Sequence, residues 1–161
     1  MSNVIRVGIA DMKICEAPDK ITTIGLGSCI GIVIYDRSKK IAGLVHIMLP
    51  DSSQIKNNLN KMKFADLGIE LLIDELISRG CKKESLKAKI AGGAKMFNFT
   101  GTSDLVSIGD KNIAAVKHVL AKNNIQIVAE DVGENYGRTI IFDVETCVLQ
   151  IITAGGNSKE I

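Results

Sequence analysis

The first 50 residues consist of short apolar runs separated by polar breaks. Ile5, Val7 and Ile9 occupy alternate positions, which is the pattern of a strand with one apolar face. Further apolar runs predict strands at residues 12–15, 21–26, 29–35 and 41–48. The polar stretch 36–40 joins the last two runs, so we expect them to form a hairpin.

The apolar spacing becomes helical after residue 63. A stripe of apolar residues between positions 64 and 76, followed by Gly80 as a C-cap, predicts one helix. A second stripe between positions 113 and 120 predicts another helix, which the Asn123-Asn124 pair should end. Four more apolar runs predict strands at residues 86–91, 125–130, 139–143 and 148–152.

Strands that outnumber the helices and do not alternate strictly with them favour an α+β fold over a doubly wound one. We therefore expect a layered sandwich of mixed β-sheet with two principal helices packed on it. The 161 residues suit one domain, 1–161. Residues 50–63 predict a surface loop, 96–104 an irregular segment and 154–161 a polar tail.

Composition and charge exclude several classes of partner. Lys and Arg number 20 against 18 for Asp and Glu, and the signs are interspersed, so no field favours nucleic acid. The longest apolar stretch, 41–50, is half of the roughly 20 residues that a membrane helix needs, so we expect no membrane insertion. The N-terminus lacks the apolar core of a secretory signal, which predicts a cytoplasmic protein.

The cysteines at positions 15, 29, 81 and 147 form no Cys-x-x-Cys pair, and the chain has only two histidines. This spacing excludes a zinc knuckle and a thioredoxin-like motif, so we expect free thiols and no metal. Cys29 alone lies in a glycine cluster, Gly25-Leu26-Gly27-Ser28-Cys29-Ile30-Gly31. Glycines allow a backbone to approach a ligand closely. The N–H groups of Ser28 and Cys29 are candidate donors to an oxyanion.

His46 is the candidate base for a Cys29 nucleophile, since a free thiol is mostly protonated at neutral pH. The alternatives are a buried core thiol and a packed core histidine. If the hairpin loop has four residues, Asp36 faces Ile41, and Cys29 and His46 become diagonal neighbours on one face. A shift of one residue would put them on opposite faces.

Five segments together resemble the CheD-type chemoreceptor glutamine deamidases. Two surround the candidate residues: Thr23-Ile24-Gly25-Leu26-Gly27-Ser28-Cys29 and Ala42-Gly43-Leu44-Val45-His46-Ile47-Met48-Leu49-Pro50. Three follow in order: Ala91-Gly92-Gly93-Ala94-Lys95-Met96-Phe97, Ile108-Gly109-Asp110-Lys111-Asn112 and Ala129-Glu130-Asp131-Val132-Gly133-Glu134-Asn135-Tyr136-Gly137-Arg138. Lys111 and Glu134 depart from the family pattern, which has Arg and Gly there.

The resemblance implies Cys29 as nucleophile, His46 as general base and then acid, and Thr23 as third member of the site. The glycine cluster itself makes Gly27 and Ser28 the candidate substrate-binding and oxyanion residues. The implied reaction converts receptor glutamines to glutamate through a cysteine thioester, without a metal or organic cofactor. Hydrolysis of glutamate methyl esters would use the same acyl-enzyme. The implied partners are the cytoplasmic helices of methyl-accepting chemotaxis receptors and a CheC-type phosphatase.

Two other functions remain open from the sequence. One is a regulatory binding module that acts mainly through the CheC-type phosphatase, with catalysis lost or secondary. The other is a cysteine hydrolase of small amides or peptides. Deamidation of a receptor by the wild type but not by Cys29→Ala would distinguish the deamidase from the binding module. Activity on small amides in the absence of receptor would favour the small-amide hydrolase.

Overall fold

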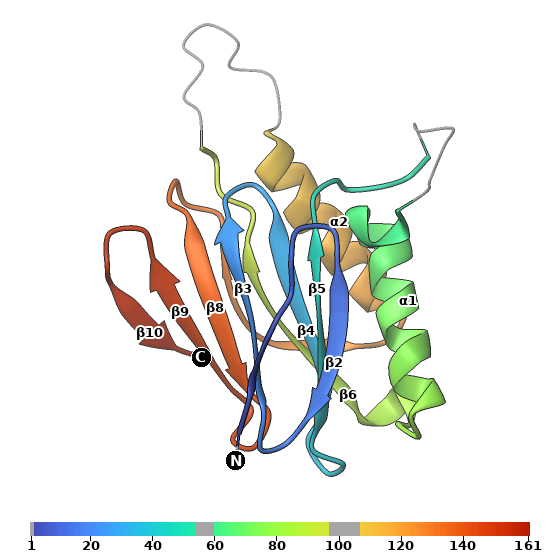
Figure 1. Ribbon diagram of the computed structural model, residues 1–161. Coiled ribbons are helices and arrows are strands. Elements are labelled where there is room, and N and C mark those ends of the chain that lie inside the picture. The colour runs from blue at the N-terminus through green and yellow to red at the C-terminus, as the bar shows by residue number, and fades with distance from the viewer. Residues whose placement is uncertain (1, 54–59, 97–106) are drawn as a thin grey trace, which may run out of the picture.

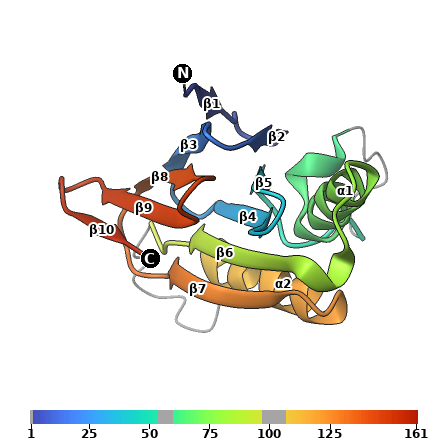
Figure 2. The ribbon, with the colours of Figure 1, turned by 90° about the horizontal axis from the view of Figure 1, so that it is seen from below.

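The computed structural model describes residues 2–53, 60–96 and 107–161. These residues form two five-stranded sheets that lie face to face, with two helices on the outer face of one sheet (Figures 1 and 2). The predicted α+β layered sandwich with two principal helices is confirmed. The order of layers is sheet, sheet, helices, so one sheet is covered on both faces.

The first sheet has the strand order β1-β3-β8-β9-β10. Its strands are β1 (Val4–Arg6), β3 (Lys20–Leu26), β8 (Arg138–Asp143), β9 (Val148–Thr153) and β10 (Ser158–Glu160). Strand β1 runs parallel to β3, and the other neighbours are antiparallel. We call this sheet A.

The second sheet, sheet B, has the strand order β2-β5-β4-β6-β7. Its strands are β2 (Met12–Glu16), β5 (Ile41–Ile47), β4 (Ile30–Asp36), β6 (Leu86–Gly92) and β7 (Gln126–Val132). The β6–β7 pair is parallel, and the others are antiparallel. Every residue of β4 and β5 is buried, because sheet A covers one face of these strands and the helices cover the other.

Helices α1 (Ala65–Ser78) and α2 (Ile108–Lys122) pack on sheet B, and short 3₁₀ turns occupy Lys61–Lys63 and Lys83–Ser85. Ser107 is the N-cap of α2, and its side chain accepts a hydrogen bond from the backbone N–H of Asp110. Gly80 follows α1 with a φ of +99°, as the predicted C-cap requires. Neither helix of the described residues is long and apolar enough to cross a membrane.

The alternation of side chains along β4 divides the interior into two cores. Ile30, Ile32 and Ile34 face the helices, whereas Val33 and Tyr35 face sheet A. The core between the sheets also contains Leu26 of β3 and Leu44 of β5, among others. Any polar side chain on the inner face of these strands is therefore removed from water and needs a partner.

Two sequence predictions need correction. Strand β1 ends at Arg6, and Ile9, expected on the same strand face as Ile5, is 58% exposed in the connection to β2. Residues 154–161, predicted as a polar tail, contain β10, which pairs with β9. All three side chains of β10 are exposed, so the pairing left no apolar pattern in the sequence. Residues 54–59 of the predicted loop and 97–104 of the predicted irregular segment lie outside the described residues.

Candidate active site

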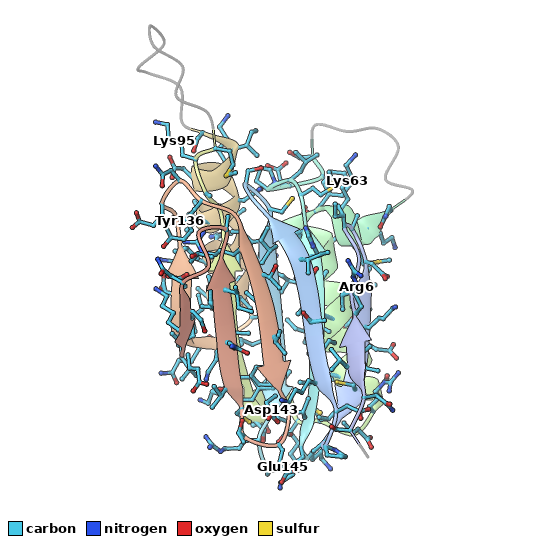
Figure 3. The ribbon with its side chains drawn as sticks, turned by 60° about the vertical axis from the view of Figure 1, so that its left-hand side comes forward. Arg6, Lys63, Lys95, Tyr136, Asp143 and Glu145 are labelled. Carbon is cyan, nitrogen blue, oxygen red and sulfur yellow. The ribbon has the colours of Figure 1, made fainter. Side chains whose placement is uncertain are left out.

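The connection between β3 and β4 carries Gly27, Ser28 and Cys29 from sheet A to sheet B. It lies at the end of the sandwich that is uppermost in Figure 1. Lys63 and Lys95 lie at this same end, and Asp143 and Glu145 lie at the opposite one (Figure 3). The crossing places the candidate nucleophile where the two sheets meet.

The hairpin of β4 and β5 has the register of a four-residue loop, one of the two possibilities that the sequence left open. Asp36 faces Ile41, and the ladder continues to Gly31 opposite His46 and Ile30 opposite Ile47. Cys29 precedes Gly31 by two residues and packs against the core between the sheets. Cys29 and His46 therefore lie on the face of the hairpin that is turned toward sheet A.

His46 is fully buried and is bonded to Thr23 of the opposite sheet. Its Nδ1 lies 2.8 Å from Thr23 Oγ1, and the same hydroxyl donates to the carbonyl oxygen of Val7 at 2.7 Å. A hydroxyl has one proton, so Thr23 must accept from Nδ1–H of His46. This chain of bonds selects the tautomer in which Nε2 carries a free lone pair.

The Nε2 atom of His46 has no hydrogen-bond partner among the described residues. Burial lowers the pKa of His46 to about 4, so the ring is neutral at physiological pH. Burial also raises the pKa of the Cys29 thiol, and the Cys29 backbone N–H acts in the opposite direction. Both shifts favour the uncharged forms, a thiol at Cys29 and a neutral imidazole at His46, over a thiolate–imidazolium pair.

Three consecutive carbonyl groups hold the Cys29 connection in place. The carbonyl of Gly27 accepts from the N–H of Ala94 at 2.8 Å, and that of Cys29 accepts from the N–H of Gly93 at 2.9 Å. Between them, the Ser28 carbonyl accepts from Nδ2 of Asn112 at 2.9 Å. Within the described chain, the N–H groups of Ser28 and Cys29 have no backbone acceptor. These are the two groups that the sequence suggested as oxyanion donors.

Comparison with known protein families assigns this chain to a family. The family model described as CheD chemotactic sensory transduction matches residues 48–153. The chain belongs to the CheD family. A relative from Lachnoclostridium phytofermentans, named probable chemoreceptor glutamine deamidase CheD, is 52% identical over 161 residues and all of both chains. The chemoreceptor glutamine deamidase CheD of Bacillus subtilis (strain 168) is 52% identical over 159 residues, or 98% of this chain and 96% of that one.

Among solved structures, the Bacillus licheniformis hypothetical protein YfiH has a TM-score of 0.48 and 14% identity, covering 75% of this chain and 49% of that one. This likeness is too weak to indicate a function. The two CheD relatives align across Thr23, Cys29 and His46, which precede the segment that the family model matches.

The CheD-matched segment contains glycines that support the Cys29 connection. Gly92 has a φ of +118°, and a Cβ there would lie 2.2 Å from the carbonyl oxygen of Cys29. A Cβ on Gly109, in the first turn of α2, would lie 2.5 Å from the carbonyl oxygens of Gly93 and Ala94. Only glycine allows β6, the connection and α2 to approach this closely. The sequence contained these glycines within the segments that resemble CheD, but it gave no indication that close backbone contacts require them.

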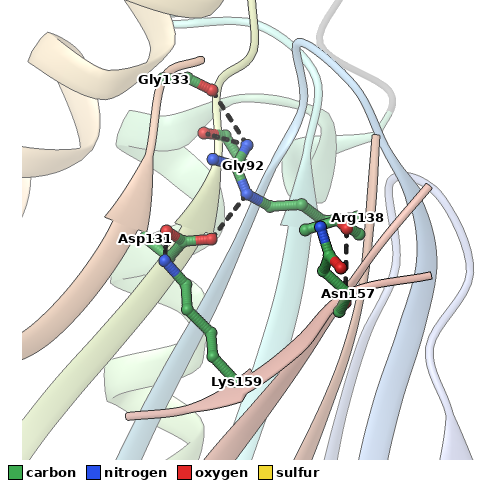
Figure 4. A network of polar contacts seen from close by, with 7 residues as sticks. Gly92, Asp131, Gly133, Arg138, Asn157 and Lys159 are labelled. Carbon is green, nitrogen blue, oxygen red and sulfur yellow. Dashed lines mark hydrogen bonds and ion pairs between the residues drawn. The ribbon is translucent and has the colours of Figure 1, made fainter. Parts of the chain in front are cut away.

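A buried ion pair between Arg138 and Asp131 holds the backbone at Gly92, next to the Cys29 connection (Figure 4). Arg138 Nε donates to Asp131 at 2.9 Å, and its Nη1 donates to the carbonyl oxygens of Gly92 at 3.4 Å and Gly133 at 3.0 Å. Lys159 of β10 reaches the other oxygen of Asp131 at 2.5 Å. Burial raises the pKa of Asp131, but the hydrogen bonds from Lys159 and Arg138 hold it below its ordinary value. Sequence reasoning missed these roles, which depend on contacts between distant segments.

The other thiols lie away from this arrangement. Cys15, Cys81 and Cys147 are buried and free, and burial raises the pKa of each, for Cys15 to about 11. Such thiols are poor nucleophiles at neutral pH. Within the described residues, no group of three or more His, Cys, Asp or Glu side chains is placed to hold a metal ion.

Proposed function

We propose that this protein deamidates glutamine side chains of chemoreceptors, with Cys29 as nucleophile, His46 as general base and acid, and Thr23 as the residue that orients His46. One observation carries the proposal: the Thr23–Val7 bonds leave a free lone pair on His46 Nε2, on the strand face that Cys29 shares. The names of the CheD relatives supply the substrate class.

The first half of the reaction is acyl transfer to sulfur. His46 Nε2 takes the proton of the Cys29 thiol as Sγ bonds to the side-chain amide carbon of glutamine. The amide oxygen becomes negative and accepts hydrogen bonds from the N–H groups of Ser28 and Cys29, while Gly27 leaves room for the substrate. Protonated His46 then gives its proton to the amide nitrogen. The C–N bond breaks, ammonia leaves, and a glutamyl thioester remains on Cys29.

The second half returns the free enzyme. His46 Nε2 takes a proton from water, whose oxygen attacks the thioester carbon. The C–S bond breaks, Sγ regains a proton from His46, and glutamate is released. Protons and electron pairs balance with water as the only co-reactant. A glutamate methyl ester would form the same thioester with methanol as the leaving group, so we propose methyl ester hydrolysis as a related activity.

A regulatory role through a CheC-type phosphatase is the alternative, and its support is membership of the CheD family. In that case binding would persist without catalysis. The geometry at His46 favours the enzyme, because a buried ring nitrogen without a partner costs stability that a mere binding module has no reason to retain. Because the proposed substrate glutamines lie on the cytoplasmic helices of receptors, we also propose that the protein acts in the cytoplasm.

The test is incubation of a purified receptor cytoplasmic fragment with the wild type, Cys29→Ala and the control Cys81→Ala, followed by mass spectrometry of receptor peptides. Deamidation adds about one dalton per glutamine, because an oxygen replaces an NH group. We expect the shift with the wild type and Cys81→Ala, and none with Cys29→Ala. No shift with any of the three, together with retained binding to a CheC-type phosphatase, would establish the binding module instead.

A further inference from the structure

The hydrogen-bonded ladder between β4 and β5 ends just before the candidate nucleophile. Its last pair is Ile30 and Ile47. Beyond that pair, the N–H groups of Met48 and Leu49 both donate to the carbonyl oxygen of Lys63, at 2.8 and 3.0 Å. Met48 and Leu49 are thus bonded to a different neighbour, and neither offers its N–H to the Ser28 carbonyl. The two strands would separate here unless another group joined them.

Asn112 of α2 is that group. Its Nδ2 donates to the carbonyl oxygen of Ser28 at 2.9 Å and to that of Met48 at 3.0 Å. Both partners are acceptors only, so the orientation of the amide is fixed and both hydrogens of the NH₂ group are used. The side chain is fully buried, and its Oδ1 has no partner among the described residues. A buried amide with an unpaired oxygen costs stability, so Asn112 is poorly explained as a packing residue.

The position of the two carbonyls gives Asn112 a functional meaning. Ser28 directly precedes Cys29, and Met48 follows His46 by two residues. One amide group therefore sets the separation of the nucleophile and base segments where the ladder no longer does. The peptide between Ser28 and Cys29 is planar and trans, so its N–H points opposite to its C=O. Fixing the Ser28 carbonyl toward Asn112 thereby directs the Cys29 N–H away from Asn112.

We propose that Asn112 is a positioning residue for the reaction: it holds Cys29, and the oxyanion donor on its backbone, in register with His46. The proposal rests on the function proposed above. It assigns no contact with substrate to Asn112, which acts through the Ser28 and Met48 carbonyls. Loss of the amide should therefore reduce the rate of the chemical step and leave receptor binding nearly unchanged.

The experiment compares Asn112→Ala and Asn112→Ser with Asn123→Ala. Asn123 lies at the other end of α2, and its Nδ2 also donates to one backbone carbonyl, that of Val119, at 2.8 Å. We expect kcat for receptor deamidation to fall about 10- to 100-fold in Asn112→Ala, with KM within about threefold of the wild type. The kcat of Asn112→Ser, which retains one donor, should lie between those of Asn112→Ala and the wild type. Asn123→Ala should keep the wild-type kcat.

A second readout needs no receptor. The rate at which iodoacetamide alkylates Cys29 at pH 7, measured by peptide mass spectrometry, should fall about tenfold in Asn112→Ala and remain unchanged in Asn123→Ala. If the wild type deamidates no receptor, the proposed function fails, and the alkylation rates still decide the role of Asn112. If Asn112→Ala does not fold, Asn112→Ser carries both measurements. Wild-type kcat and wild-type alkylation in a folded Asn112 variant would overturn the proposal.

Discussion

Thr23 Oγ1 and His46 Nδ1 lie 2.8 Å apart and join β3 of sheet A to β5 of sheet B. The contact is fully buried, and the Val7 carbonyl that accepts the Thr23 proton is main chain. The tautomer of His46 therefore depends on the packing of the two sheets rather than on solvent. In the proposed reaction, a base oriented in this way would need no acidic partner to present Nε2 to the thiol.

Substitutions of Thr23 can distinguish its role in orienting His46 from its role in packing between the sheets. Thr23→Val keeps the shape but removes the acceptor for Nδ1–H, so we expect kcat to fall about 10- to 100-fold. Thr23→Ser keeps the hydroxyl and should stay within about threefold of the wild type. The matched control is Thr22→Val, because the Thr22 hydroxyl also donates to a backbone carbonyl, that of Ile140, at 2.7 Å, without touching His46. Equal losses of kcat in the two valine variants would contradict the assigned role.

The pH dependence of kcat/KM should show an unusually low acid limb. A histidine whose pKa is lowered to about 4 remains a competent base well below the ordinary 6.5. The alkaline limb should lie above the range of an exposed thiol, because burial raises the pKa of Cys29. Initial rates of deamidation between pH 4 and pH 10 check both limbs. An acid limb near 6.5 would show that His46 is solvated in the active enzyme.

Stability should also depend on pH through His46. Above pH 6.5 the imidazole is neutral in both folded and unfolded chains. Between 6.5 and about 4 the unfolded chain binds a proton that the folded chain excludes, so stability falls with pH, by about 3 kcal/mol over the whole window. The variant His46→Gln cannot titrate and should lose less between pH 7 and pH 4.5. Urea unfolding of both proteins at these two pH values measures the difference, and parallel losses would refute it.

A methyl group at Gly92 should disrupt the Cys29 connection. In Gly92→Ala the Cβ would meet the Cys29 carbonyl oxygen at 2.2 Å, and backbone rather than a flexible side chain would have to move. We expect a loss of about 3 kcal/mol or more in the free energy of unfolding, and deamidation near background. Gly156→Ala is the control, since Gly156 also has a positive φ, +89°, but open space around its Cα. It should lose about 1 kcal/mol and keep its activity.

Local patterns in the sequence were enough for the layered fold and the two helices. The hairpin register stayed open between a four-residue loop and a shift of one residue. The structure has the four-residue loop, which puts Cys29 and His46 on a shared face. Strand β10 could not be predicted from the sequence, because all its side chains are exposed. Its pairing with β9 depends on backbone hydrogen bonds, which leave no pattern of apolar residues.

The supports of the site were harder to predict for a different reason. Thr23 and Thr22 are equivalent in the local pattern, and only the resemblance to CheD singled out Thr23. In the structure both hydroxyls donate to main-chain carbonyls, and the strand's alternation turns only Thr23 toward β5. Asn112 is 83 residues from Cys29 in the sequence, so its contact with Ser28 follows from the packing of α2 rather than from any local signal.

The most direct test of the central claim replaces each cysteine in turn and measures receptor deamidation by peptide mass. Cys15→Ala, Cys81→Ala and Cys147→Ala remove buried thiols that lie outside the proposed reaction, and we expect each to keep deamidation within a few-fold of the wild type. Cys29→Ala should leave every receptor glutamine at its original mass. Deamidation by Cys29→Ala at the wild-type rate would contradict the proposed nucleophile.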